Sequence, residues 1–435
     1  MSQEIERILK RGVAEVIIEE DLRRMLENGR PLRLKEGFDP SRPDIHLGHV
    51  VGLRKLRQLQ DLGHLVILIV GDWTAQIGDP SGQSQMRTML SAEEVKENAE
   101  TYMKQFFKVV DPDKTEVRWQ SEWFGNFTLA DVIKLTSKFT VAQMLAREDF
   151  SKRYQSGSPI GITELLYPLL QAYDSVMIES DVEFGGIDQK FNCLLGRELQ
   201  EMVGQKPQQV FFTPLLVGTD GSMKMSKSLN NYISVDDPPG EMYGKVMSLP
   251  DTLIMDYFEL LTDVPDEDLS EFRNQLEKDS VNPMDLKKRL AREIVTDFHD
   301  EQSAGDAEEN FRKTIQEKQV PDDIPTAYVS FDELLKISGD VQVEAQRDGD
   351  LDNFAEHIGG KGIIGGDKIQ TIMIDVLLPK LGLVSSRNEA KRLLNQKAVK
   401  IDGKTVTEPR GDIKNGSVIK VGKRRYARIM NSDDK

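Results

Sequence analysis

The sequence predicts an α/β protein with a Rossmann-type, doubly wound parallel sheet, followed by an α-helical domain and a small, basic α+β domain. Its 435 residues exceed the length of a typical single domain. Residues 65–70 form an uninterrupted apolar run of strand length, which is typical of a parallel strand buried on both faces. This run follows a helical pattern and precedes a loop rich in Gly, Asp and Pro. Such an alternation is the element order of a doubly wound sheet.

The first part of the chain supplies the opening elements of that sheet. Residues 1–30 carry apolar side chains at helical spacing and are expected to be helical, and residues 33–38 are expected to form a strand. Residues 39–44 contain two prolines and two aspartates and predict a loop. Residues 47–62 have one apolar face and predict a helix that ends at a glycine.

The middle of the chain continues the same alternation. Residues 78–82, which contain two glycines and a proline, predict a second loop. The periodicity then predicts, in order, a helix at 164–180, a strand at 181–184, a helix at 188–203, a strand at 210–217 and a polar loop at 218–230.

The rest of the chain predicts three further segments. Residues 240–335 lose the strand signals and are expected to be mainly helical, and residues 337–366, rich in Asp and then Gly, predict a linker or irregular insertion. We then expect helices at 371–381 and from Ser386, which has capping-box spacing to Glu389, and strands at 399–401 and 418–421. The expected domains are 1–236, 237–336, 337–369 and 370–435.

The charge distribution is strongly asymmetric. The net charge of the chain is −16, yet residues 380–430 carry 14 Lys and Arg against four Asp and Glu, a net charge of +10. The first 379 residues therefore carry −25. The basic block has apolar periodicity and turn signals, which favours a folded, phosphate-binding module over a solvated tail.

Composition indicates the compartment. The single cysteine, Cys193, excludes an intrachain disulfide and is typical of a reducing cytoplasm. No run of about 18 apolar residues occurs, so no membrane span is expected. The N-terminal residues lack a basic segment followed by an apolar one, so no secretion signal is expected.

The first chemical motif is residues 46–49 (HLGH) at the start of an expected helix. Three roles are open for His46 and His49: metal binding, a structural role, or phosphate handling. Only five histidines occur in the chain and no cysteine lies nearby, so a metal site is not favoured. A helix N-terminus offers free N–H groups to phosphate, and Gly48 would let a nucleotide approach the backbone.

The second motif is residues 224–228 (KMSKS), in a loop after the expected strand 210–217. Short basic strings are usually solvated turns, but the end of a parallel strand would bring this loop to the same sheet edge as His46. Together the two strings resemble the HIGH and KMSKS signatures of the class I aminoacyl-tRNA synthetases. The second matches letter for letter, and the first differs only at Leu47.

This resemblance implies activation of an amino acid by ATP, which is expected to bring Mg²⁺. Attack of a carboxylate on the α-phosphate builds negative charge on pyrophosphate, so the protein must supply positioning and charge stabilisation. The lysines of a mobile loop would close on the β- and γ-phosphates, and the histidines would serve the other side. The implied catalytic residues are His46, His49, Lys224, Ser226 and Lys227.

A polar stripe points to the amino acid. Tyr167, Gln171 and Asp174 recur at i, i+4 and i+7, so they share one helix face. A polar stripe is usually solvated, but leucines surround this one, which favours a pocket-facing stripe. With residues 37–40 (GFDP), 78–82 (GDPSG) and 185–189 (GGIDQ), it resembles the bacterial tyrosyl-tRNA synthetases.

The resemblance implies roles position by position. The ammonium group of L-tyrosine would be held by Asp79, Tyr167 and Gln171, with Gln189 nearby. Asp174 would accept a hydrogen bond from the substrate hydroxyl, and Asp39 would hold the amino acid and the adenylate. ATP would be bound by Ser41, His46, Gly48, His49, Gly186, Asp188, Lys224 and Lys227. Arg87 falls where the family has a basic residue in a mobile loop used with pyrophosphate and tRNA.

Several positions depart from the family pattern. Lys35 stands where many members have a tyrosine that contacts the substrate hydroxyl, so Lys35 or another group serves there, or Asp174 carries more of the recognition. Glu36, Gln83 and Glu183 also differ from the commonest residues. This family is the standard example of a site that rejects phenylalanine without editing, because its polar groups would be left unpaired. No editing domain is therefore expected.

The basic C-terminal block resembles a small RNA-binding module, the S4 domain, in residues 385–394 and 399–404. This implies contacts to tRNA(Tyr) by Arg387, Lys391 and Arg392, and the family likeness implies a homodimer. Two rival readings remain at this stage. A tryptophanyl enzyme shares the fold and both signatures, although Gln171 and Asp174 argue against it. A synthetase-like protein that only binds RNA is disfavoured because both signatures are retained.

Overall fold

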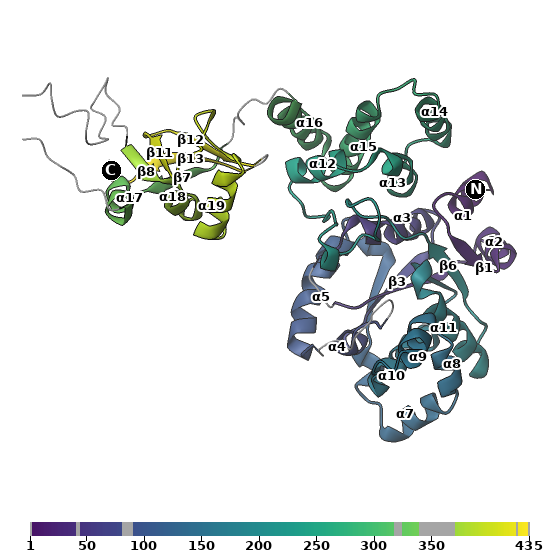
Figure 1. Ribbon diagram of the computed structural model, residues 1–435. Coiled ribbons are helices and arrows are strands. Elements are labelled where there is room, and N and C mark those ends of the chain that lie inside the picture. The colour runs from purple at the N-terminus through teal and green to yellow at the C-terminus, as the bar shows by residue number, and fades with distance from the viewer. Residues whose placement is uncertain are drawn as a thin grey trace, which may run out of the picture. The chain divides into compact units, whose positions relative to one another are not determined.

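The computed structural model describes residues 2–40, 44–80, 90–316, 324–338, 370–422 and 425–433 (Figure 1). The chain forms two compact units, a first unit of Met1–Phe311 and a second unit of Arg312–Lys435. Of the expected linker at 337–366, residues 337 and 338 end a helix and residues 339–366 lie outside the described residues, as do positions 81–89. Within the described residues, no helix is both long enough and apolar enough to cross a membrane.

The first unit is built on a six-stranded sheet. Its strands are β1 (Glu15–Ile17), β2 (Arg33–Phe38), β3 (Leu65–Val70), β4 (Thr115–Trp119), β5 (Val182–Gly186) and β6 (Gln209–Thr213). Their spatial order is β1-β6-β5-β2-β3-β4, in which β6 through β4 are parallel and β1 pairs antiparallel with β6. The predicted doubly wound fold is confirmed. The strand order reverses between β2 and β5, which is where such sheets bind ligands.

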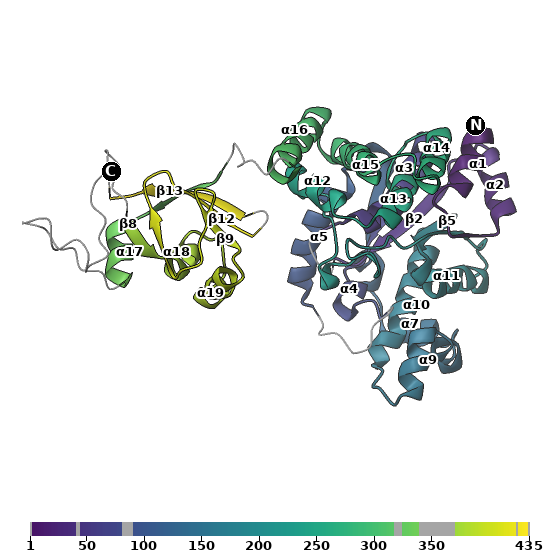
Figure 2. The same ribbon diagram turned by 45° about the horizontal axis from the view of Figure 1, so that its top comes forward.

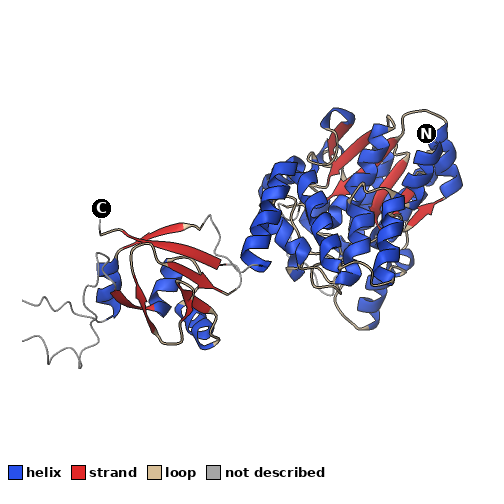
Figure 3. Cartoon of the chain, turned by 90° about the horizontal axis from the view of Figure 1, so that it is seen from above, coloured by secondary structure: helices blue, strands red, loops and turns tan. Residues whose placement is uncertain are grey.

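Helices cover both faces of this sheet (Figure 3). They are α1 (Ser2–Lys10), α2 (Glu19–Glu27), α3 (Leu47–Asp61), α4 (Thr74–Ile77), α5 (Ala92–Phe106), α6 (Ser121–Phe124), α7 (Leu129–Thr136), α8 (Val141–Leu145), α9 (Glu148–Gln155), α10 (Ile162–Met177) and α11 (Lys190–Met202). β3 shows why its sequence is continuously apolar. Val66, Leu68 and Val70 pack into the core with α3 and α5, whereas Ile67 and Ile69 pack on the opposite face.

A group of helices follows the sheet and belongs to the same unit (Figure 2). It comprises α12 (Pro239–Met247), α13 (Ile254–Leu261), α14 (Asp266–Glu277), α15 (Pro283–Phe298) and α16 (Glu301–Phe311). Tyr243, Tyr257 and Phe258 from these helices are buried in the same apolar core as α3. The expected helical character of this region is confirmed up to Phe311. Its end differs, because residues 326–329 form a strand of the second unit.

The second unit is a small α+β module. It contains β7 (Thr326–Val329), α17 (Phe331–Ser338), β8 (Gln370–Met373), α18 (Ile374–Lys380), α19 (Arg387–Asn395), β9 (Val399–Ile401), β10 (Lys404–Thr405), β11 (Arg410–Ile413), β12 (Val418–Val421) and β13 (Arg425–Asn431). Its main sheet has the order β10-β9-β12-β13-β7, and β8 pairs with β11. The predicted strands 399–401 and 418–421 and the helix capped by Ser386 are confirmed.

Three local predictions are corrected. Residues 1–30 are not wholly helical, because β1 adds an edge strand to β6. The expected strand 210–217 ends at Thr213, before Pro214, which has no N–H to continue a ladder. Residues 371–381 begin as β8 rather than as helix, because Gln370–Met373 pair with β11. In the first and third cases pairing with a distant strand overrides the local periodicity.

Candidate active site

A cavity of about 760 Å³ opens at the carboxyl ends of the parallel strands. The cavity is lined by residues at these strand ends. Phe38 ends β2 and Asp39 follows it, Gly71 follows β3, Gln120 follows β4, Gly186 ends β5 and Thr213 ends β6. The topology therefore gathers residues from five strands around one space, at the reversal of strand order.

Most of the expected site residues meet in this cavity. Those lining it are Asp39, His46, Gly48, His49, Asp79, Tyr167, Gln171, Asp174, Gly186, Asp188, Gln189, Lys224, Ser226 and Lys227. Ser41 and Arg87 lie outside the described residues. Arg387, Lys391 and Arg392 lie on α19 of the second unit. Lys35 is the one described residue of the first unit that was expected in the site and does not line the cavity.

His46 and His49 cap the N-terminus of α3. Nδ1 of His46 accepts from the Gly48 N–H at 3.2 Å, and Nδ1 of His49 accepts from the His46 N–H at 3.2 Å. In a neutral imidazole whose Nδ1 accepts, the proton sits on Nε2, so each ring keeps one donor for a ligand. A Cβ on Gly48 would stand 2.9 Å from the His46 ring, which explains the glycine.

The electrostatic surroundings keep both rings uncharged. Burial, together with the charge of Lys227, lowers the pKa of His49 to about 4. Burial also lowers the pKa of His46, assisted by His49, Lys227 and Lys224. At neutral pH the pair therefore donates hydrogen bonds as neutral imidazoles and carries no positive charge. Within the described residues no three His, Cys, Asp or Glu form a group that would hold a metal ion.

The segment after β6 forms the loop that carries the two lysines. Met225 is buried and its N–H donates to the Leu216 carbonyl at 2.7 Å, and the Ser226 N–H donates to Asn231 Oδ1 at 2.8 Å. Asn231 also donates to Asp220 at 2.8 Å. These bonds fix the loop at its ends.

The two lysines of this loop contact carboxylates of the cavity. Lys224 Nζ lies 2.9 Å from Asp188 Oδ2, and Lys227 Nζ lies 3.8 Å from Asp44 Oδ2. The Lys224 side chain is half exposed, whereas that of Lys227 is largely buried. A negatively charged ligand that enters between them would exchange these carboxylate contacts for its own oxygens.

A chain of hydrogen bonds joins the polar groups on the other side of the cavity. The Tyr167 hydroxyl donates to Asp39 Oδ2 at 2.8 Å, and Thr74 Oγ1 donates to Asp39 Oδ1 at 2.7 Å. Gln120 Oε1 accepts from the Thr74 N–H at 3.0 Å. Gln120 Nε2 then donates to Asp174 Oδ2 at 2.8 Å. Asp39 and Asp174 are thus held in fixed orientations as acceptors.

Asp174 is a buried carboxylate with two donors. Besides Gln120, the Trp123 indole N–H donates to its Oδ1 at 3.1 Å. Burial raises the pKa of Asp174 to about 7, and the charge of Lys35 and these hydrogen bonds oppose that rise. Each carboxylate oxygen retains a further lone pair, so Asp174 can accept one more hydrogen bond from a ligand.

Asp79 belongs to a second network. Gln189 Nε2 donates to Asp79 Oδ2 at 2.8 Å, and Asn192 Nδ2 donates to Gln189 Oε1 at 3.0 Å. The buried Arg147 donates to Asn192 Oδ1 at 3.1 Å and lies 3.7 Å from Asp79 Oδ1. This ring of contacts holds Asp79 and Gln189 side by side in the cavity wall.

Lys35 occupies a different place from the one expected. It is fully buried behind the cavity, and Nζ donates to Glu183 Oε1 at 2.8 Å, to Ser175 Oγ at 2.7 Å and to the Gln171 carbonyl at 2.9 Å. These three bonds use all three ammonium hydrogens, so none remains for a ligand. Lys35 takes this place because the register of β2 and β5 sets it directly opposite Glu183. Glu183 also accepts from Gln171 Nε2 at 3.2 Å.

Sequence reasoning missed Thr74, Gln120, Trp123, Arg147 and Asn192. The sequence position of two of them could have indicated their role. Gln120 and Trp123 come just after β4, and the carboxyl ends of parallel strands form the site. It was not used because residues 115–119 (TEVRW) alternate in polarity and do not form an apolar run. Arg147 and Asn192 carry no comparable local signal.

The cavity therefore combines two kinds of chemistry. Asp39, Asp79 and Asp174 offer acceptors for a cationic group and for a hydroxyl. His46, His49, Lys224 and Lys227 offer donors and positive charge for an anion such as a polyphosphate. An amphoteric substrate and a nucleotide fit this combination.

Comparisons with known proteins identify the same two parts. Residues 27–316 match the family described as tRNA synthetases class I (W and Y), and residues 374–419 match the S4 domain. A tyrosine–tRNA ligase of Dehalococcoides mccartyi (strain CBDB1) is 57% identical over 427 residues, which cover 98% of each chain. One from Thermotoga maritima is 48% identical over 435 residues, covering 99% of this chain and 98% of the relative.

Among solved structures, the tyrosyl-tRNA synthetase from Archaeoglobus fulgidus complexed with L-tyrosine is similar to this chain. Its TM-score is 0.58 at 26% identity, and the match covers 71% of this chain and 100% of that chain.

Proposed function

The chain belongs to the bacterial tyrosyl-tRNA synthetases, a family of class I enzymes, and from this membership we propose how its cavity carries out the reaction. The enzyme is a tyrosine–tRNA ligase. L-Tyrosine and ATP give tyrosyl-adenylate and pyrophosphate, and the tyrosyl group then passes to the 3′-terminal adenosine of tRNA(Tyr). The observation that carries the mechanism is the meeting of three acidic acceptors with two histidines and two lysines in one cavity.

The acidic networks suit the amino acid. In this proposal Asp79, Tyr167 and Gln171 hold the substrate ammonium, and Gln189 supports Asp79 through its 2.8 Å bond. Asp174 accepts a hydrogen bond from the substrate hydroxyl. Lys35 acts indirectly, because its bond to Glu183 fixes the carboxylate that orients Gln171. Phenylalanine has no hydroxyl and would leave Asp174 without a hydrogen-bond donor. We propose that the enzyme discriminates against phenylalanine on this basis.

The basic groups suit the nucleotide. Nε2–H of His46 and of His49 would donate to the triphosphate, and Asp188 would accept from the ribose hydroxyls. Lys224 and Lys227 would bind the β- and γ-phosphates as charge moves onto pyrophosphate. We propose that ATP enters with Mg²⁺ bound by its own phosphate oxygens, since the described residues supply no cluster of three ligands.

ATP–pyrophosphate exchange with single amino acids tests this function. We expect exchange with tyrosine and none with tryptophan. Exchange with tryptophan alone would establish the tryptophanyl rival. No adenylate with any amino acid would leave only an RNA-binding role.

Replacing Asp174 by asparagine should weaken tyrosine binding. A hydrogen bond to a charged acceptor contributes about 1.5–3 kcal/mol, so KM for tyrosine should rise roughly tenfold to a hundredfold, with KM for ATP unchanged. Steady-state exchange kinetics at pH 8 would measure both constants. A change in KM for ATP equal to that for tyrosine would contradict the assignment.

The same carboxylate predicts a pH dependence. Its pKa is raised to about 7, so it takes up a proton as the pH falls through neutrality and becomes a weaker acceptor. KM for tyrosine should therefore rise between pH 8 and pH 6 in the wild type and stay flat in Asp174→Asn. Glu36, which also lines the cavity and whose pKa is raised to about 8 by burial and by Glu183, is the control. Glu36→Gln should retain the rise.

We also propose a homodimer, formed through α7 to α10. Large apolar side chains are exposed on these helices, including Leu129 (76% exposed), Ile133, Val141, Tyr154 and Ile162 (81% exposed). Leu129 and Ile133 are four residues apart and so share one face of α7. A patch of this kind is typical of an interface with a second copy.

Leu129→Asp combined with Ile133→Asp should convert the dimer to a monomer, because two desolvated carboxylates would be placed in an apolar interface. Sedimentation velocity would measure the mass. Met284→Asp, at an exposed apolar position on α15, is the matched control and should stay dimeric. A double variant that sediments like the wild type would exclude this interface.

The compartment we propose is the cytoplasm. The lone cysteine is buried at position 193, and tRNA charging takes place where translation does.

A further inference from the structure

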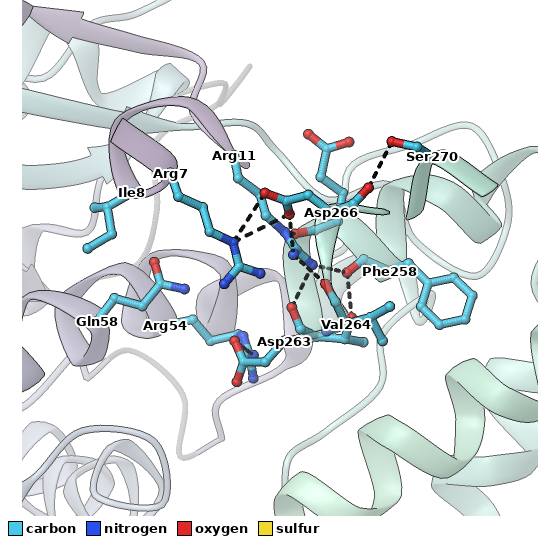
Figure 4. A network of polar contacts seen from close by, with 12 residues as sticks. Arg7, Ile8, Arg11, Arg54, Gln58, Phe258, Asp263, Val264, Asp266 and Ser270 are labelled. Atoms are coloured by element: carbon cyan, nitrogen blue, oxygen red, sulfur yellow. Dashed lines mark hydrogen bonds and ion pairs between the residues drawn. The ribbon is translucent and has the colours of Figure 1, made fainter. Parts of the chain in front are cut away.

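The first unit contains a second cavity, of about 330 Å³, which shares no lining residue with the active-site cavity. Its wall is formed by α1, the second half of α3, residues 108–109 after α5, Asp263 after α13, and the end of α15. Figure 4 shows how the side chains of Arg7, Arg11 and Arg54 converge here on Asp263 and on Asp266, the first residue of α14. No step of tyrosine activation requires this cavity.

The wall of the second cavity is rich in positive charge. Six basic residues line it, namely Arg7, Arg11, Arg54, Lys55, Arg57 and Lys108. Four carboxylates line it as well, namely Glu4, Asp61, Asp263 and Asp297. Two further carboxylates beside the wall pair with its cations, because Asp266 lies 3.3 Å from Arg7 and 2.8 Å from Arg11, and Asp236 lies 2.5 Å from Lys108.

The arginines of this cavity are already matched by protein groups. Arg54 pairs with Asp263 at 2.6 Å and with Asp297 at 2.8 Å. Arg11 donates to four backbone carbonyls of residues 258–264 and to Asp266 at 2.8 Å (Figure 4). These contacts hold the side chains of Arg11 and Arg54 in fixed positions in the wall.

Lys55 is the exception. Its side chain is only 6% exposed, yet Nζ donates to two neutral acceptors, the Ile8 carbonyl at 3.1 Å and Gln58 Oε1 at 3.3 Å. Within the described residues no carboxylate lies within ion-pair distance of it. Burial and the charges of Arg11, Arg7 and Arg54 lower the pKa of Lys55 to about 7. A buried ammonium with a free N–H, ringed by guanidinium groups, is short of one anionic partner.

We propose that the second cavity binds an oxyanion of the phosphate class, with Lys55 as its central donor. A phosphate group carries its negative charge on non-bridging oxygens, which are strong hydrogen-bond acceptors and fit the free N–H of Lys55. The cavity is large enough for a phosphate and its waters. The phosphate comes either from a free ion or from a singly charged phosphodiester in the backbone of the bound tRNA. Both sources offer negatively charged non-bridging oxygens to Lys55.

Inorganic phosphate is the probe for the test. The full-length chain with Lys224→Ala and Lys227→Ala, which weakens phosphate binding in the active site, serves as the background. Calorimetric titration with phosphate at constant ionic strength should show one site. Lys55→Met, which keeps the length of the side chain and removes its charge, should weaken this binding at least tenfold. No phosphate binding in the background chain, or equal binding in Lys55→Met, would overturn the proposal.

Gln58→Glu is the second variant and does not depend on removing a buried group. Its carboxylate would stand about where Gln58 Oε1 now lies, 3.3 Å from Lys55 Nζ, and would supply the missing negative charge from within the chain. We expect a higher Tm than the background without phosphate, and loss of the phosphate site. Unchanged phosphate affinity in Gln58→Glu would overturn the proposal even if Lys55→Met fails to fold.

Two kinetic measurements then separate the sources of the phosphate. With the wild-type active-site loop restored, Lys55→Met and Gln58→Glu should raise KM for tRNA if the phosphate belongs to the tRNA backbone. If the phosphate is a free ion, KM for tRNA should stay unchanged while the calorimetric site is still lost. In both cases ATP–pyrophosphate exchange should proceed, because the cavity lies outside the tyrosine and ATP site.

Discussion

Replacing Lys227 by alanine should slow tyrosyl-adenylate formation by a factor of roughly 10² to 10³ while leaving tyrosine affinity nearly unchanged. Loss of one preorganised donor to a developing charge has an effect of that order. Lys227 lines the cavity with a largely buried side chain, and its charge lowers the pKa of both His46 and His49. It therefore sits beside the groups expected to bind the triphosphate. Its ammonium would interact most strongly with pyrophosphate as that group leaves, so the rate should suffer and tyrosine binding should not.

Single-turnover formation of the adenylate measures the rate, and equilibrium dialysis measures tyrosine affinity. The measurements belong at pH 8, because removal of the Lys227 charge raises the pKa of both histidines and they must remain neutral. Lys206→Ala, which removes an exposed lysine outside the cavity, is the matched control and should behave as the wild type. A large loss of tyrosine affinity with an unchanged rate would contradict the assignment of Lys227 to the phosphates of ATP.

The sheet could be predicted from sequence where strands are buried on both faces. Residues 65–70 are apolar throughout because β3 faces helices on either side. Asp39 and Gly186 were named from the family resemblance, and both line the cavity at the carboxyl ends of parallel strands. Edge strands gave no such signal. Within the part of the chain that the structure describes, β4 pairs only with β3, and its residues alternate in polarity. β1 is three residues long and pairs with β6. Gln120 and Trp123, which hold Asp174, were missed with β4.

Lys35 shows a different limit of sequence reasoning. A lysine within a strand is expected at a surface or at a ligand, because a buried ammonium is costly. Here the parallel register of β2 and β5 sets Lys35 opposite Glu183, 148 positions later in the chain, and Ser175 and the Gln171 carbonyl complete its bonds. Only the sheet order brings these partners together. The departure of Lys35 from the family pattern is therefore matched by the departure of Glu183, and the two form one buried pair.

A chain that ends at residue 316 should still form tyrosyl-adenylate at about the wild-type rate but should charge tRNA poorly. The first unit ends at Phe311, whose ring packs 5.5 Å from that of Tyr243, so a cut after residue 316 preserves this contact and the cavity. A cut near residue 366 is less clean, because it leaves β7 and α17 without β13 and exposes the apolar side chains of Phe331 and Leu334. The truncated chain would lose the +10 block, and with it the contacts to tRNA phosphates that block is expected to make.

Exchange and aminoacylation assays on the same preparation measure the two steps. We expect kcat/KM for tRNA to fall by roughly 10² or more while the exchange rate changes less than about twofold.

A full-length variant with Lys391→Ala and Arg392→Ala should lose less of its kcat/KM for tRNA than the truncated chain does. Its kcat/KM for tRNA should also depend less on salt concentration, because the variant removes two positive charges and keeps the fold. Arg387 is left in place in that variant, since it pairs with the buried Asp375 at 2.8 Å and its removal would leave a poorly matched buried carboxylate. Unimpaired charging by the truncated chain would show that the second unit does not contact tRNA. Loss of exchange as well would show instead that the two units are coupled in tyrosine activation.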